Sequence, residues 1–127
     1  MKWRWVDKRL LLLLHDESLA EHGGASGLRD EGLFDSALAR PLNLLAYGKP
    51  DFADLAAAYA VGLAKNHCFV DGNKRVALLA VGLFLHLNGR RLTAPQADAT
   101  LTMQGLADGE VSEAAFAAWL RVHSARR

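Results

Sequence analysis

The most regular pattern of apolar and polar positions lies in the middle of the chain. Apolar residues recur there at spacings of three and four, at Phe52, Leu55, Ala56, Tyr59, Ala60 and Leu63. This spacing places them on one face of an α-helix, because the helix repeats every 3.6 residues. We therefore expect an amphipathic helix that begins near Phe52 and ends near Asn66.

A second strong helix is predicted from about Asn73 to Asn88. Between Val76 and Leu87 it is apolar on nearly every side, and His86 is the only polar residue in that stretch. A helix that is hydrophobic all round is typical of one surrounded by other helices. We expect this helix, residues 73–88, to be the central one.

Four further helices are predicted from apolar spacing and from capping residues. The second of them should break at Arg40-Pro41, because proline fits poorly inside a helix, and Pro41 could begin another short turn. Their expected ranges are Val6–Glu21, Glu31–Ala39, Pro95–Asp108, and a last helix through Phe116 and Leu120 with Ser112 as its N-cap.

The composition supports an all-α fold. The chain has 23 Leu and 22 Ala but no Ile and three Thr, so it favours helix formers over the β-branched residues that strands prefer. Its 127 residues suit one domain, spanning 1–127, with no repeat or linker. We expect a single compact bundle of about six helices.

Charge, cysteine content and hydropathy exclude several classes of protein. Lys and Arg number 15 against 14 Asp and Glu, which gives no sign of a protein that binds nucleic acid through net charge. The single cysteine, Cys68, excludes an intrachain disulfide and favours a reducing compartment. The leucine run 10–14 is too short for a membrane span. We expect a cytoplasmic protein that binds neither membrane nor nucleic acid.

The segment between the two strongest helices, HCFVDGNKR at 67–75, concentrates the reactive side chains. Gly72 can adopt backbone angles that other residues avoid and Asn73 can cap the next helix, so N–H groups would point outward there and attract anions. Lys74 and Arg75 occupy the first turn, where the helix dipole disfavours cations. A bound phosphate would make the two cations favourable in this position, because its negative charge would attract them. We therefore predict a polyphosphate site.

Two further residues of this segment extend the prediction. Asp71 offers a carboxylate suited to Mg²⁺, which takes one or two protein carboxylates together with phosphate oxygens and waters. The imidazole of His67 can accept a hydroxyl proton near neutral pH. Each residue alone has an ordinary structural explanation, as a cap, a turn residue or a solvated helix start. The combination within nine residues favours a site.

This segment resembles the motif of the Fic/Doc family, and most closely that of the Doc (death-on-curing) toxins. The Fic pattern is His-Pro-Phe-x-Asp/Glu-Gly-Asn-Gly-Arg-x-x-Arg, with Lys in place of the second Gly in Doc members, and here the chain has HCFVDGNKRVAL. The stretches 27–41 (GLRDEGLFDSALARP) and 83–89 (LFLHLNG) also look like the family's flanking segments. The resemblance covers roughly the whole chain.

The resemblance implies a role for each residue of the motif. His67 would be the general base, Phe69 a core anchor and Asp71 the Mg²⁺ ligand. Contacts to the phosphates of ATP would come from Gly72, Asn73, Lys74 and Arg75.

Two departures from the Fic pattern bear on the activity. Cys68 replaces the usual proline, which should leave the loop slightly less restricted. Leu78 stands where AMP-transferring Fic enzymes have a second arginine. The resemblance therefore implies Doc-like transfer of the γ-phosphate of ATP to a Ser or Thr hydroxyl, with elongation factor Tu as the expected target. It also implies a bacterial antitoxin whose C-terminal segment binds a groove on the toxin.

Several alternatives stay open. AMP transfer would use the same base and metal ligand, and a non-catalytic helical module, such as a helix–turn–helix regulator, would use neither. Cys68 is more plausible as a bystander than as a nucleophile, and the histidines have no zinc-site spacing. Lys65 could help to bind ATP or the protein substrate, or it could lie near a helix end only because the helix dipole favours a cation there. Residues 23–31 could cover the site or form an ordinary loop, and Trp3 and Trp5 could be core or surface.

Overall fold

The protein, seen here in a computed structural model that describes residues 2–127, is built from six helices and a two-stranded ribbon. The strands β1 (Arg90–Leu92) and β2 (Ser124–Arg126) pair antiparallel, with Arg90 opposite Arg126. The predicted all-α class is confirmed, and the sequence pattern did not predict the ribbon. The helices are α1 (Lys8–His22), α2 (Glu31–Tyr47), α3 (Phe52–Lys65), α4 (Asn73–Leu87), α5 (Gln96–Asp108) and α6 (Glu113–Val122). None of the helices in residues 2–127 has the length and apolarity to span a lipid bilayer.

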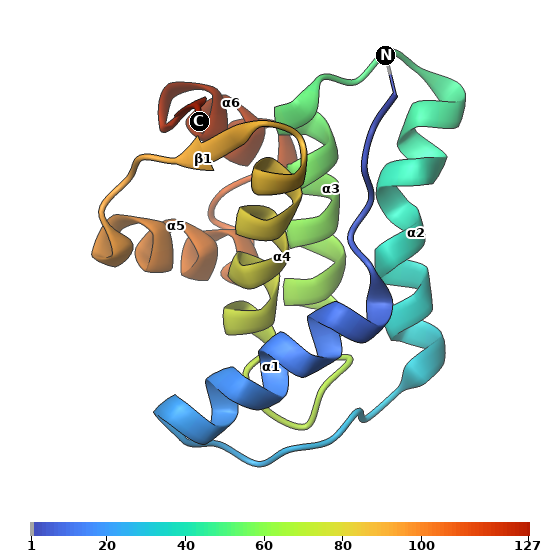
Figure 1. The fold of residues 1–127 in the computed structure, drawn as a ribbon, viewed down its shortest axis with the longest axis vertical. Helices are drawn as coiled ribbons and strands as arrows, with labels where there is room; N and C mark the ends of the chain where they lie inside the picture. The colour runs from blue at the N-terminus through green and yellow to red at the C-terminus, as the bar shows by residue number, and fades with distance from the viewer. Residues whose placement is uncertain (1) are drawn as a thin grey trace.

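Helices α3 and α4 lie side by side at the centre of the molecule (Figure 1). α3 contacts α2, α4, α5 and α6, and ten of its fourteen residues are buried. α4 contacts α1, α3, α5 and β1, as expected of a helix surrounded by others. One face of α4 is less covered than the sequence suggested, because Leu78, Leu79 and Leu83 are only partly buried and line a groove.

The segment before α1 packs against the central helices. Trp3 and Trp5 each stack on Phe84 of α4 with ring centroids 6.1 Å apart. The backbone N–H of Val6 donates to the hydroxyl of Tyr59 in α3 at 3.0 Å. Both tryptophans are partly buried against the core, so they belong to the packing of the fold.

Helix α2 continues through Pro41, so the predicted break at Arg40-Pro41 is wrong. A proline inside a helix removes one backbone hydrogen bond. Tight packing on α3 outweighs this loss: a Cβ on Gly62 would lie 2.9 Å from the Cα of Ala37, and Arg40 Nε donates to the carbonyl of Ala58 at 3.2 Å. Contacts with α3 in the turn before Pro41 therefore help to hold the helix together.

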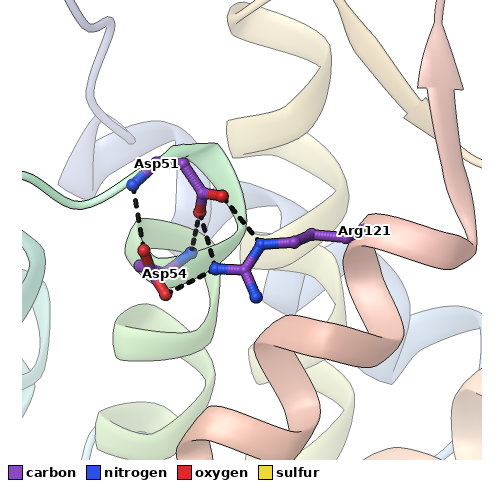
Figure 2. Close-up of polar contacts among 3 residues, drawn as sticks. All are labelled: Asp51, Asp54 and Arg121. Carbon is purple, nitrogen blue, oxygen red and sulfur yellow. Dashed lines mark hydrogen bonds and ion pairs between the residues drawn. The ribbon is translucent and has the colours of Figure 1, made fainter.

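A polar cluster fixes the start of α3 to α6. Asp51 and Asp54 form a reciprocal capping box, in which each carboxylate accepts the other residue's backbone N–H. Arg121 of α6 donates from Nε to Asp51 at 2.7 Å and from Nη2 to Asp54 at 2.8 Å (Figure 2). The last helix begins at its predicted cap, where Ser112 Oγ accepts the N–H of Ala115.

Candidate active site

The segment predicted to carry the chemistry connects α3 to α4, and residues 27–30 hold it in place. The carbonyl of Cys68 accepts the N–H groups of Arg29 at 2.7 Å and Asp30 at 3.0 Å. The N–H of Val70 donates to the carbonyl of Gly27 at 3.0 Å. The segment before α2 therefore lies along the motif and restricts it, which a free surface connection would not do.

Phe69 anchors the loop in the core, as expected from the resemblance. Its side chain is buried, and its ring lies 5.1 Å from that of Phe34 in α2 and 4.3 Å from that of His15 in α1. Aromatic pairs at such distances add to the free energy of burial. Two helices, α1 and α2, thus contact one side chain of the motif.

Asn73 does not cap α4, so the predicted capping role is wrong. The N-cap is Gly72, which adopts a left-handed conformation (φ 75°) and makes no side-chain cap bond. The amide of Asn73 bonds back to Phe69 instead: Oδ1 accepts its N–H at 3.0 Å and Nδ2 donates to its carbonyl at 3.1 Å. These two bonds close the loop, and the helix start keeps its N–H groups free of a side-chain cap.

The carboxylate of Asp71 is held by backbone donors. Oδ1 accepts the N–H of Gly72 at 2.9 Å, and Oδ2 accepts the N–H of Ala25 at 3.3 Å. A Cβ on Gly24 would lie 3.0 Å from Oδ2, so only glycine fits easily there. Each oxygen keeps a further lone pair, so the exposed carboxylate can still act as a ligand of a cation. A single fixed carboxylate fits Mg²⁺ bound jointly with phosphate oxygens.

The remaining side chains of the predicted site are His67 and the two cations, Lys74 and Arg75. His67 is exposed and has φ 51°, the only positive φ of a non-glycine residue in the described part of the chain. Arg29 Nε donates to its carbonyl at 2.7 Å and helps to hold this unusual backbone. Lys74 is exposed, and Arg75 Nη1 donates to the carbonyl of Gly23 at 3.2 Å.

One groove brings all six predicted site residues together. It has a volume of about 1170 Å³ and extends along α4 between α1 and α5. Leu78, the position of the missing arginine, also lines it. Lys65 is exposed at the end of α3 and is not among the lining residues. The predicted members of the groove wall are His67, Asp71, Gly72, Asn73, Lys74 and Arg75.

Cys68 is fully buried beside this groove, and burial raises the pKa of its thiol. Since the thiolate is the nucleophilic form, this environment suppresses its reactivity. The structure therefore agrees with the interpretation of Cys68 as a bystander.

Sequence reasoning missed one residue that contacts the motif. His15 of α1 is 1% exposed, and its Nε2 lies 3.1 Å from the carbonyl oxygen of Asp71. The available signal was a histidine in a leucine-rich helix, at a position that the helical period places beside Leu11 and Leu19. That signal marks a buried polar group but does not name its partner.

Comparison with known proteins identifies the family of the chain. The model of the Fic/DOC family matches residues 5–85. "Protein kinase doc" of Escherichia phage P1 is 35% identical over 119 residues, which cover 93% of this chain and 94% of that protein. "Toxin Doc" of Mycolicibacterium smegmatis is 49% identical over 75 residues, which cover 57% of each chain. The chain therefore belongs to the Fic/DOC family and, within it, is similar to the Doc proteins.

Proposed function

We propose that this protein is a Doc-like toxin that transfers the γ-phosphate of ATP to a Ser or Thr hydroxyl of a protein. The observation that carries the proposal is the convergence of His67, Asp71 and the start of α4 on one groove. A base, a metal ligand and an anion-binding helix end are the parts that phosphoryl transfer requires. The similarity to a relative named as a protein kinase supports the same activity.

The phosphates of ATP would bind at the start of α4. The first N–H groups of a helix have no partner inside it, and the helix dipole adds partial positive charge there. The left-handed backbone of Gly72 starts α4 with no side-chain cap, so no side chain bonds to these N–H groups as a cap. Lys74 and Arg75 would balance the phosphate charge, which removes the cost of placing cations in the first turn.

Mg²⁺ would bind to the Asp71 carboxylate together with the phosphates. The ion would supply positive charge that stabilises the phosphate groups. This chain contributes an oriented ligand, since the N–H groups of Gly72 and Ala25 fix both carboxylate oxygens.

His67 would act as the general base. Its imidazole would take the proton of the target hydroxyl while the hydroxyl oxygen attacks the γ-phosphorus in line and ADP leaves. The left-handed backbone at His67, with its carbonyl bonded to Arg29, fixes where the side chain leaves the loop. Leu78 offers no charge to an ATP oriented for attack at the α-phosphate, which favours phosphate transfer over AMP transfer.

The family resemblance supports elongation factor Tu as the target, in the cytoplasm of a bacterium, with arrest of translation as the effect. It also supports inhibition by an antitoxin of a type II pair. The antitoxin's C-terminal segment would fold as a helix on the apolar part of the groove. That part is formed by Leu14, Leu78, Leu79, Gly82, Leu83, Met103 and Ala107.

Transfer of label from γ-labelled ATP to purified elongation factor Tu tests the proposal. We expect His67→Ala to lower the transfer rate at least about 100-fold, because proton transfer by a positioned base contributes that much. His86→Ala is the matched control, since His86 is exposed at the other end of α4 and lines the same groove. Equal transfer by wild type and His67→Ala would refute the assignment of the base.

A further inference from the structure

The polar ring of His15 is buried in a place that an apolar side chain could fill. It lies on α1 with 1% of its surface exposed, between the buried Leu11 and Leu19 on the same face. Its Nδ1 has no hydrogen-bond partner among the described residues. Burial of an unpaired polar atom costs free energy that a leucine would avoid. The packing of α1 alone therefore does not explain the histidine.

His15 contacts three residues of the motif loop. Nε2 lies 3.1 Å from the carbonyl oxygen of Asp71, and the ring lies 4.3 Å from that of Phe69. A Cβ on Gly72 would lie 2.8 Å from its Cε1, so the ring and the left-handed glycine are in close contact. The ring therefore lies against both residues that the Asp71–Gly72 peptide bond joins.

The contact with Asp71 defines the protonation of the ring. A carbonyl oxygen can only accept a hydrogen bond, so Nε2 must carry the proton. Burial lowers the pKa of His15 and so favours the neutral ring, in which Nδ1 carries a lone pair. The ring thus donates one directed hydrogen bond to the motif.

We propose that His15 is a positioning residue of the active site, which fixes the Asp71–Gly72 peptide through the bond from Nε2. This inference rests on the proposed phosphate transfer. The orientation of that peptide sets both the direction of the Asp71 carboxylate and the first N–H groups of α4. His15 itself is buried beneath the loop and does not touch the reacting atoms.

The variants His15→Gln and His15→Met test this inference as a matched pair. The two side chains have similar length, flexibility and helix propensity, but only glutamine can donate to the Asp71 carbonyl. We expect His15→Gln to keep kcat for label transfer within about threefold of wild type. We expect His15→Met to lower kcat at least about tenfold and to raise the Mg²⁺ concentration for half-maximal rate, because small misplacements at a reacting centre are costly.

The melting temperatures of both variants separate this role from a structural one. Equal losses of kcat in the two variants, or losses that follow the melting temperature, would overturn the inference. If wild type transfers no phosphate, the proposed function fails and the positioning role is still tested by amide exchange. Exchange at Gly72 and Asn73 should then be faster in His15→Met than in His15→Gln, and equal rates would overturn the inference.

Discussion

Asn73 shows how one side chain can hold the loop between two helices. An asparagine at the start of a helix can cap it, but here its amide bonds both backbone groups of Phe69. This arrangement fixes the turn and leaves the helix end open to a phosphate. The sequence predicted that His67, Asp71 and Lys74 lie close together, because they are near neighbours in the chain. It could not predict that Asn73 turns back to Phe69, or that His15 approaches Asp71 from 56 positions away.

Replacement of Asn73 by alanine should separate this role from general stability. Asn73→Ala leaves the N–H and carbonyl of Phe69 without partners, so we expect a loss of about 1–3 kcal/mol in the free energy of unfolding. Label transfer should fall at least about tenfold below wild type even at temperatures where the variant is folded, because the loop is less ordered.

Asn88→Ala is the control at the other end of α4. Asn88 makes a similar pair of bonds to the backbone of Arg4, at 3.0 and 2.9 Å. We expect a comparable loss of stability, measured by urea unfolding, with transfer unchanged. Equal losses of transfer in the two variants would contradict the role given to Asn73.

At the scale of elements, the helices that sequence pattern predicted best are those with continuous apolar stripes. α3 and α4 begin and end within a residue or two of their expected bounds. α2 was predicted too short, because the penalty of Pro41 is a local property while the compensating contacts with Gly62 and Ala58 come from another helix. The ribbon of β1 and β2 was missed because three-residue strands give too few positions for an alternating pattern.

The link between α3 and α6 predicts a specific dependence of stability on pH. Burial of Asp51 raises its pKa, but the bonds from Arg121 and from the backbone of Asp54 outweigh this and hold the pKa at about 2, below the ordinary 3.8. The unfolded chain therefore binds this proton more readily, so the stabilisation is present above about pH 4 and is lost as pH falls towards 2. Asp51 and Arg121 are more than a third exposed, so solvent screening limits the contribution to about 1 kcal/mol.

Urea unfolding of wild type and Arg121→Met between pH 7 and pH 2 measures this contribution. The variant should be less stable by about 1 kcal/mol at pH 7, and the difference should shrink below pH 4. A difference that stays constant over the whole range would show that Arg121 stabilises the fold by packing alone.

At the scale of the whole molecule, one groove joins the motif to an apolar surface. Its walls come from α1, α4 and α5, so a helix bound there would lie next to the proposed phosphate site. The groove could not be predicted from the sequence, because α4 is apolar on nearly every side and the pattern does not show which face stays open. Gly82 lies on that face, and a Cβ there would meet nothing within 4 Å.

Gly82→Phe should block the groove without harming the fold. We expect a change of at most about 1 kcal/mol in stability, because removal of a glycine from a helix interior is favourable and the ring enters open space. Binding of the proposed antitoxin, measured by calorimetry, should be lost. Leu42→Phe, on an exposed part of α2 outside the groove, is the control and should bind normally. Normal binding by Gly82→Phe would show that the partner binds outside this groove.

The fate of the phosphates of ATP distinguishes phosphate transfer from AMP transfer. Wild-type protein would be incubated with Mg²⁺, elongation factor Tu and ATP labelled at either the γ- or the α-phosphate. We expect the target to acquire the γ-label alone, and transfer by His67→Ala to be at least about 100-fold slower. Transfer of the α-label would show AMP transfer, and would mean that Leu78 does not exclude that orientation of ATP. Absence of both labels from the target and from any protein of a cell extract would contradict the proposed kinase activity.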